Sequence, residues 1–454
     1  MNRTRPPAIA APADYRFPAP LRRTLGNGMR LVLIERPAAN FAEFRMVFEG
    51  GFAADPGERS GLCGLAMEVL TQGRLDGGRG RADRFVERLG ATLRARATVD
   101  AGVIEMSAFA AKLDASIKAF ADAVLCPRFE AKDLEAVRSI RRATIAREKT
   151  SPFALALRLV PALVYPKGDP YAKPFTGSGT ESGLENISLD DLRAFYRENL
   201  VPARATLVAA GPAIDALAVS VEKAFAAWRA ERVDSPREPE VAARAESDSA
   251  RAAIADFPGA AQSAVFAAFA TVPRASASAE ALIAADAILA RMFTSRLNMN
   301  LREAKGWTYG VRSFLGDARR RGLWIVYAFV EREMTGAAMR EIERELHAIS
   351  DGHPPSREEL SRAASYLSST VPMACETTAQ VASLVADGVA CGLAEDYYCG
   401  FVERIGRIGV KDLANVVRDI SRLKPITWLV ACDAASVSAH LESSGFALRA
   451  FEAD

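Results

Sequence analysis

Residues 206–211 read Thr-Leu-Val-Ala-Ala-Gly, and residues 427–432 read Thr-Trp-Leu-Val-Ala-Cys. Both are short apolar runs bounded by turn residues, a pattern that indicates buried β-strands. Each run follows a proline and, further upstream, an Asp-Leu pair that opens a predicted helix: Pro202 and Asp191-Leu192 in the first case, Pro425 and Asp412-Leu413 in the second. The same order thus recurs at an offset of about 220 residues, which predicts an internal repeat.

Other segments repeat at the same offset. Val47-Phe48 corresponds to Ala268-Phe269, and the apolar helix around residues 62–70 corresponds to the one around residues 282–289. In each half, predicted strands such as residues 29–34 come first and core-facing helices such as residues 115–125 follow. This order favours an α+β fold with two homologous α/β domains, each a largely antiparallel sheet with helices packed on one face.

Composition sets the domain limits and the general class. We expect a disordered, proline-rich arm at 1–20, a first domain at 21–228, a solvated linker at 229–250 and a second domain at 251–454.

A net charge of +2 gives no overall positive field that would attract nucleic acid. The apolar runs are shorter than the roughly 18 residues of a membrane helix. The start lacks a secretory apolar core and the six cysteines form no C-x-x-C pair. We therefore expect a cytoplasmic protein, with the periplasm as the alternative.

Arginines cluster in two places, along residues 79–96 and at Arg319-Arg320-Arg321. The simplest interpretation is a solvated face and a hairpin tip. A surface that meets an acidic substrate or partner is the alternative.

A glycine-rich turn, Gly50-Gly51-Phe52-Ala53-Ala54-Asp55-Pro56-Gly57, precedes a helix capped near Ser60, Gly61-Leu62-Cys63-Gly64-Leu65-Ala66-Met67-Glu68-Val69-Leu70, which Gly73 follows. From about Leu21 to Phe446 the chain resembles the pitrilysin-type (M16) zinc metallopeptidases. The smaller two-domain bacterial and mitochondrial members are the most similar.

In active members this helix carries the zinc motif His-x-x-Glu-His, which presents two imidazoles and a carboxylate to the metal. The three motif positions fall on Gly64, Met67 and Glu68, and Glu68 is turned by about 100° from the position of the motif glutamate. The family's third ligand, counted back from Ser151-Pro152, falls on Thr144. The resemblance therefore implies a degenerate site, and we expect this chain to bind no metal and to be inactive alone.

Residues 301–311 read Leu-Arg-Glu-Ala-Lys-Gly-Trp-Thr-Tyr-Gly-Val. This pattern predicts a helix end, a left-handed cap at Gly306, and a strand in which Trp307, Tyr309 and Val311 share one face. It resembles the family's Leu-Arg-x-x-x-Gly-x-x-Tyr-Gly stretch, whose arginine and tyrosine bind substrate and stabilise the transition state. By position these are Arg302 and Tyr309. Arg302 could instead complement the helix dipole, and Tyr309 could be a half-buried strand aromatic.

The resemblance implies a metal-free subunit of a heterodimeric zinc peptidase. In that arrangement the partner is a homologous zinc-bearing subunit, the Zn cofactor belongs to the partner, and this chain aligns a peptide or unfolded protein substrate. The alternatives are a non-enzymatic structural core subunit and a peptide-binding scaffold.

Overall fold

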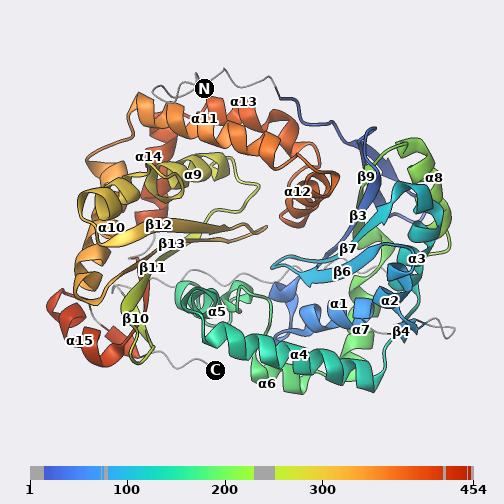
Figure 1. The fold of residues 1–454 in the computed structure, drawn as a ribbon, viewed down its shortest axis with the longest axis horizontal. Coiled ribbons are helices and arrows are strands. Elements are labelled where there is room, and N and C mark those ends of the chain that lie inside the picture. The colour runs from blue at the N-terminus through green and yellow to red at the C-terminus, as the bar shows by residue number, and fades with distance from the viewer. Residues whose placement is uncertain are drawn as a thin grey trace, which may run out of the picture.

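The computed structural model describes residues 15–72, 74–75, 80–229, 251–422, 426–446 and 448–450. Gly73 and residues 230–250 of the predicted linker lie outside the described residues. Within the described ranges, no helix has both the length and the apolar character that crossing a membrane requires. Two six-stranded sheets, one in each half of the chain, form the framework (Figure 1).

The first sheet is mixed, with a single parallel pair. Its strands in spatial order are β1 (Leu21–Thr24), β2 (Arg30–Glu35), β9 (Ala205–Gly211), β3 (Phe41–Glu49), β7 (Ala101–Phe109) and β6 (Thr92–Ala97). The helices of this half are α1 (Leu62–Gln72), α2 (Ala82–Glu87), α3 (Leu113–Leu125), α4 (Ala131–Lys149), α5 (Pro152–Val164), α6 (Glu181–Asn186), α7 (Leu189–Asn199) and α8 (Ile214–Phe225). A small sheet joins β5 (Gly80–Arg81), β4 (Arg74–Leu75) and β8 (Pro127–Arg128).

The second sheet has a similar plan, but with two parallel pairs instead of one. Its strands in spatial order are β12 (Thr308–Gly316), β13 (Gly322–Glu331), β11 (Gln262–Thr271), β14 (Thr427–Cys432), β10 (Arg251–Asp256) and β15 (Leu448–Ala450). Its helices are α9 (Ala279–Asp286), the π-helices η7 (Ala287–Arg291) and η8 (Asn298–Ala304), α10 (Thr335–Asp351), α11 (Arg357–Met373), α12 (Thr378–Ala390), α13 (Phe401–Gly406), α14 (Val410–Arg422) and α15 (Ala434–Ser443).

The two runs that open the sequence argument are β9 and β14, and they occupy equivalent places. Each pairs in parallel with an early strand of its half, so that Thr206 lies opposite Arg30 and Thr427 lies opposite Arg251. Each also pairs antiparallel with the long strand β3 or β11. The predicted α+β fold, with largely antiparallel sheets and packed helices, is confirmed.

Both sheets are apolar on both faces, because alternate residues of their strands enter different cores. In β3, Phe44 and Met46 join the core that contains α1 and α3, whereas Val47 joins the core that contains α12. In β11, Phe266 joins the core that contains α5, and Val265 joins the one that contains α9 and α10. A two-residue alternation of this kind distributes side chains to opposite faces.

The second face of each sheet is covered by a helix from the other half of the chain. Helix α12 packs on β3 and β9 of the first sheet, and α5 packs on β11 and β14 of the second (Figure 1). The ring of Phe153 in α5 lies 4.8 Å from Tyr327 and 6.2 Å from Phe314, both in the second sheet. Two helices are thus exchanged between the halves, which makes both cores continuous across the molecule.

The turn between β12 and β13 also crosses between the halves. The backbone N–H of Arg319 donates to Asp100 Oδ2 at 2.7 Å, and Arg321 pairs with Asp169 at 2.9 Å. Burial raises the pKa of Asp100, although its bond from the hydroxyl of Tyr171 opposes the shift. The hairpin tip is where the sequence predicts it, but Arg319 and Arg321 contact acidic residues of the same chain rather than solvent alone.

Part of the predicted N-terminal arm is described. Residues 15–20 form no helix or strand, yet Phe17 is buried against the second half, with its ring 5.7 Å from that of Tyr398. The remainder of the arm, residues 1–14, lies outside the described residues.

Because α5 packs on the second sheet, removing the ring of Phe153 should lower the stability of both halves of the molecule together. We predict that Phe153→Ala lowers the free energy of unfolding by about 2–4 kcal/mol, measured by urea titration, with one transition retained. Phe109→Ala is the control, since Phe109 is 42% exposed and its ring contacts Phe41 of the same sheet; it should cost about 1 kcal/mol or less. An equal loss of unfolding free energy in the two variants would contradict the exchange of helices between the halves. Separate unfolding transitions for the two halves would also contradict it.

Candidate functional site

Helix α1 carries the positions of the zinc motif, and a buried aspartate fixes its start. Asp55 accepts hydrogen bonds from the backbone N–H groups of Gly61 and Cys63, both at 2.9 Å. Burial raises the pKa of Asp55 to about 6, although these two N–H donors favour the charged form. The sequence predicts a cap near Ser60; the helix begins at Leu62, and the side chain that binds its first N–H groups is that of Asp55.

Glu68 is held by an arginine of α4. Arg141 Nε lies 3.0 Å from Glu68 Oε2, and Arg141 Nη2 lies 2.8 Å from Oε1, which is a two-pronged ion pair. Both side chains are largely buried, with exposed fractions of 12% for Arg141 and 22% for Glu68. Arg141 also donates to the carbonyl of Gly177 at 3.3 Å. A guanidinium cation therefore lies against the helix that carries the motif positions.

The other motif positions are equally unlike ligands. A Cβ atom at Gly64 would lie 2.9 Å from Arg141 Nη2 and 3.0 Å from the carbonyl of Gly177, so a larger residue there would have to displace the arginine. The thioether of Met67 is buried against Gly102 of β7. The hydroxyl of Thr144 donates to Ile140 O of its own helix at 3.0 Å. The structure thus brings Gly64 and Glu68 together around Arg141, whereas Met67 packs against Gly102 and Thr144 bonds within its own helix.

Nothing in the described ranges offers an alternative metal site. No group of three or more His, Cys, Asp or Glu side chains in that part of the chain is arranged to hold an ion. The sequence analysis did not identify Arg141. The available signal was its position on α4, one helical turn before Thr144.

Arg302 and Tyr309 flank a tight turn in the second half. Arg302 lies in the π-helix η8, and Gly306 ends this helix with φ = +69°, as the sequence predicts. The backbone N–H of Gly306 donates to Arg302 O at 3.1 Å, and that of Trp307 donates to Leu301 O at 2.9 Å. These two bonds lead the chain directly from the helix into β12.

Tyr309 projects into solvent. Its side chain is 93% exposed, and among the described residues it has no hydrogen-bond or ring partner. A β-bulge between Thr308 and Val311 interrupts the pairing with β13, so Val311 is buried while Tyr309 is not. The prediction that Trp307, Tyr309 and Val311 share one strand face is therefore wrong.

A buried asparagine holds this bulge. Asn298, at the start of η8, accepts from the backbone N–H of Val311 at 2.8 Å and donates to Val311 O at 3.2 Å. Its amide also donates to Met292 O at 3.1 Å and to Ser295 Oγ at 3.1 Å. Asn298 thus fixes the beginning of β12 relative to the helix that carries Arg302. Sequence reasoning missed it, since its partners are backbone groups with no sequence signature.

Arg302 rests on an aromatic ring. Its guanidinium carbon lies 4.5 Å from the ring centroid of Phe293, and its Nε lies 3.5 Å from Glu303 Oε1. The Phe293 side chain is itself 65% exposed. The arrangement is a cation–π contact at the surface, which orients the guanidinium without burying it. Arg302 contacts these two neighbours rather than Tyr309.

The pairing of Arg141 with Glu68 can be tested by stability. We predict that Arg141→Ala lowers the free energy of unfolding by about 2–3 kcal/mol, because it leaves the Glu68 carboxylate largely buried without a cation. Adding Glu68→Ala should recover part of the loss. The control is Arg142→Ala, the next residue of α4, whose exposed pair with Glu185 should contribute at most about 1 kcal/mol. If chemical denaturation shows the same loss of unfolding free energy for Arg141→Ala and Arg142→Ala, the buried pair has no special role in stability.

Comparisons with known proteins agree with this geometry. The sequence profile described as Insulinase (Peptidase family M16) matches residues 30–170, and that described as Peptidase M16 inactive domain matches residues 186–367. No curated protein matches the sequence.

Solved structures of similar fold include a peptidase M16 inactive domain from Pseudomonas fluorescens, with 21% identity, 91% of this chain and 97% of that one covered, and a TM-score of 0.80. A protease from Helicobacter pylori has 18% identity, coverages of 91% and 100%, and a TM-score of 0.82. Complex III2 from Candida albicans with Inz-5 bound has 17% identity, coverages of 93% and 99%, and a TM-score of 0.76. The chain therefore belongs to peptidase family M16, as an inactive member in which a glycine, a methionine and an arginine-bound glutamate stand at the positions of the zinc motif.

Proposed function

We propose that this chain is the metal-free subunit of a two-chain zinc peptidase, which aligns a peptide through Arg302 and Tyr309 against the zinc site of a homologous partner. The observation that carries the proposal is the environment of Tyr309. A tyrosine that is 93% exposed and has no partner within the described structure contributes little to folding. The alternative of a half-buried strand aromatic does not fit this exposure.

The two side chains suit the parts of a peptide bond. A phenol hydroxyl can donate to the oxygen that becomes negative when water attacks the scissile carbonyl. The guanidinium of Arg302, about a third exposed, offers a planar fork of donors to a backbone carbonyl or a carboxylate. Gly306 and the Asn298 hydrogen bonds fix the start of β12 relative to the helix that carries Arg302, which supports a joint role for the two donors.

The partner has to supply the metal and the general base. In this chain Arg141 of α4 pairs with Glu68, so the one carboxylate at the motif positions is already bound by a cation and is not free to bind a metal ion. Zinc in the partner would activate the attacking water, while residues of this chain would bind and orient the peptide.

The alternative is a non-enzymatic structural core or a peptide-binding scaffold. The similarity of fold to Complex III2 from Candida albicans supports it, because that structure is named as a complex. The two proposals differ in whether Arg302 and Tyr309 affect catalysis, and reconstitution separates them.

We predict that the isolated chain hydrolyses no peptide and that activity appears only with a homologous subunit that carries an intact His-x-x-Glu-His motif. A quenched fluorescent peptide library would report turnover for each chain alone and for an equimolar mixture. Metal analysis should find zinc only with the partner. Chelator-sensitive hydrolysis by this chain alone would refute the proposal, and a stable but inactive complex would favour the scaffold.

In the active pair, Tyr309→Phe should lower kcat by on the order of 10²-fold with little change in KM, the effect of losing one donor to the developing oxyanion. Arg302→Ala should mainly raise KM, because it acts on the placement of the substrate. Arg362→Ala is the control, since the ion pair of this exposed arginine within the described residues is with Glu358 of its own helix, α11. Wild-type kinetics in all three variants would remove both residues from the mechanism.

A further inference from the structure

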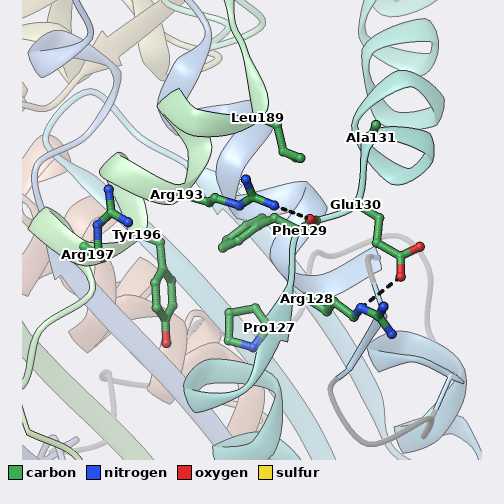
Figure 2. A pocket seen from close by; sticks show the side chains of 9 residues that line it. All are labelled: Pro127, Arg128, Phe129, Glu130, Ala131, Leu189, Arg193, Tyr196 and Arg197. Carbon is green, nitrogen blue, oxygen red and sulfur yellow. Dashed lines mark hydrogen bonds and ion pairs between the residues drawn. The ribbon is translucent and has the colours of Figure 1, made fainter.

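A cavity of about 580 Å³ opens on the first half of the molecule, far along the chain from Arg302 and Tyr309. It lies between the segment 127–131, which links β8 to α4, and the first turns of α7 (Figure 2). Its volume falls within the range of small-molecule sites. Neither the zinc-motif positions nor the Arg302 surface includes any of its lining residues.

Three arginines surround the cavity, and their charges are only partly balanced. Arg128 pairs with Glu130 at 3.1 Å, but Glu130 also pairs with Lys132 at 2.6 Å. Arg193 pairs at 3.0 Å with Asp190, whose side chain is 89% exposed. Arg197 is exposed and has no ion pair or hydrogen bond within the described residues. Exposed pairs of this kind are weak and exchange readily for a better anion.

Backbone geometry adds positive potential at the same place. Helix α4 starts at Ala131, on the cavity wall, and the side chain of its N-cap residue, Glu130, makes no capping hydrogen bond. The aligned peptide dipoles of its 19 residues place partial positive charge at this end. The cavity therefore lies where several positive contributions add.

One wall of the cavity is aromatic. The rings of Phe129 and Tyr196 meet edge to face with their centroids 5.7 Å apart, and Pro127 lies beside them (Figure 2). The Tyr196 hydroxyl donates to Val124 O at 2.8 Å, which fixes its ring. Burial raises the pKa of Tyr196 to about 12, so the phenol stays neutral and does not repel an anion.

We propose that this cavity binds a small organic anion in which a phosphate or carboxylate group is attached to an aromatic ring. Arg193 and Arg197 bind the oxyanion, and the ring packs against Phe129 and Tyr196. The proposal rests on two features that lie side by side: guanidinium groups with weak partners or none within the described residues, and a partly buried aromatic pair that forms the cavity wall.

Isothermal titration of the full chain with phenyl phosphate tests this directly. We expect one site per chain, and affinity at least about tenfold higher than for inorganic phosphate, because the ring adds apolar contact. Arg193→Ala and Arg197→Ala should each weaken binding by about tenfold or more, the scale of a lost charged hydrogen bond. Arg142→Ala, on α4 outside the cavity, should leave the affinity unchanged. Benzoate serves as the carboxylate arm and shows which oxyanion the site prefers.

Three results would overturn the proposal. They are no saturable binding of either aromatic anion at millimolar concentration, equal affinity for phenyl phosphate and inorganic phosphate, and equal weakening by Arg142→Ala and Arg197→Ala. The second would indicate an adventitious ion only. Thermal melts of each variant without ligand check that Arg197→Ala, which removes no described contact, leaves the fold intact.

Discussion

The exchange of α5 and α12 between the halves is the constraint on which the rest of the structure depends. Each sheet is apolar on both faces, and the helices of its own half cover only one of them. A sheet face left in water would forfeit the burial that offsets the entropy of ordering the chain. The halves therefore complete each other's cores, and the position of one sheet fixes the position of the other. Side chains on the second half, including Arg302 and Tyr309, consequently hold a defined place relative to α1 and α4.

Arg141 shows how a degenerate metal site remains compatible with a stable fold. A carboxylate that is largely buried needs a compensating charge, and in this chain a guanidinium from a neighbouring helix provides it for Glu68. The arginine also binds the carbonyl of Gly177, which ties the loop before α6 to α4. The space beside Gly64 is filled in the process. Restoring metal-ligating side chains would thus require removing a contact that now links three segments.

Sequence patterns predicted the features that depend on local periodicity and on the repeat. The strands β9 and β14, the long strands β3 and β11 and the fold class follow from apolar runs recurring at one offset. The left-handed cap at Gly306 follows from glycine alone. The exchange of helices was not predictable in this way, because periodicity shows that a helix has an apolar face and does not show which sheet that face meets. The roles of Arg141 and Asn298 were not predictable for a related reason, because their partners are distant in sequence or are backbone atoms.

The error over Tyr309 is the most informative of these differences. Simple alternation along 307–311 would place its ring on the same face as Val311, inside the core. The bulge held by Asn298 instead turns the tyrosine outward, at the cost of strand pairing between Thr308 and Val311. Packing would favour the regular strand, which buries another aromatic ring and keeps the ladder hydrogen bonds. A buried amide with four polar contacts at this point supports a tyrosine ring that is 93% exposed, an arrangement that the stability of the chain alone does not explain. This is the physical ground for the proposal that the phenol is presented to another molecule.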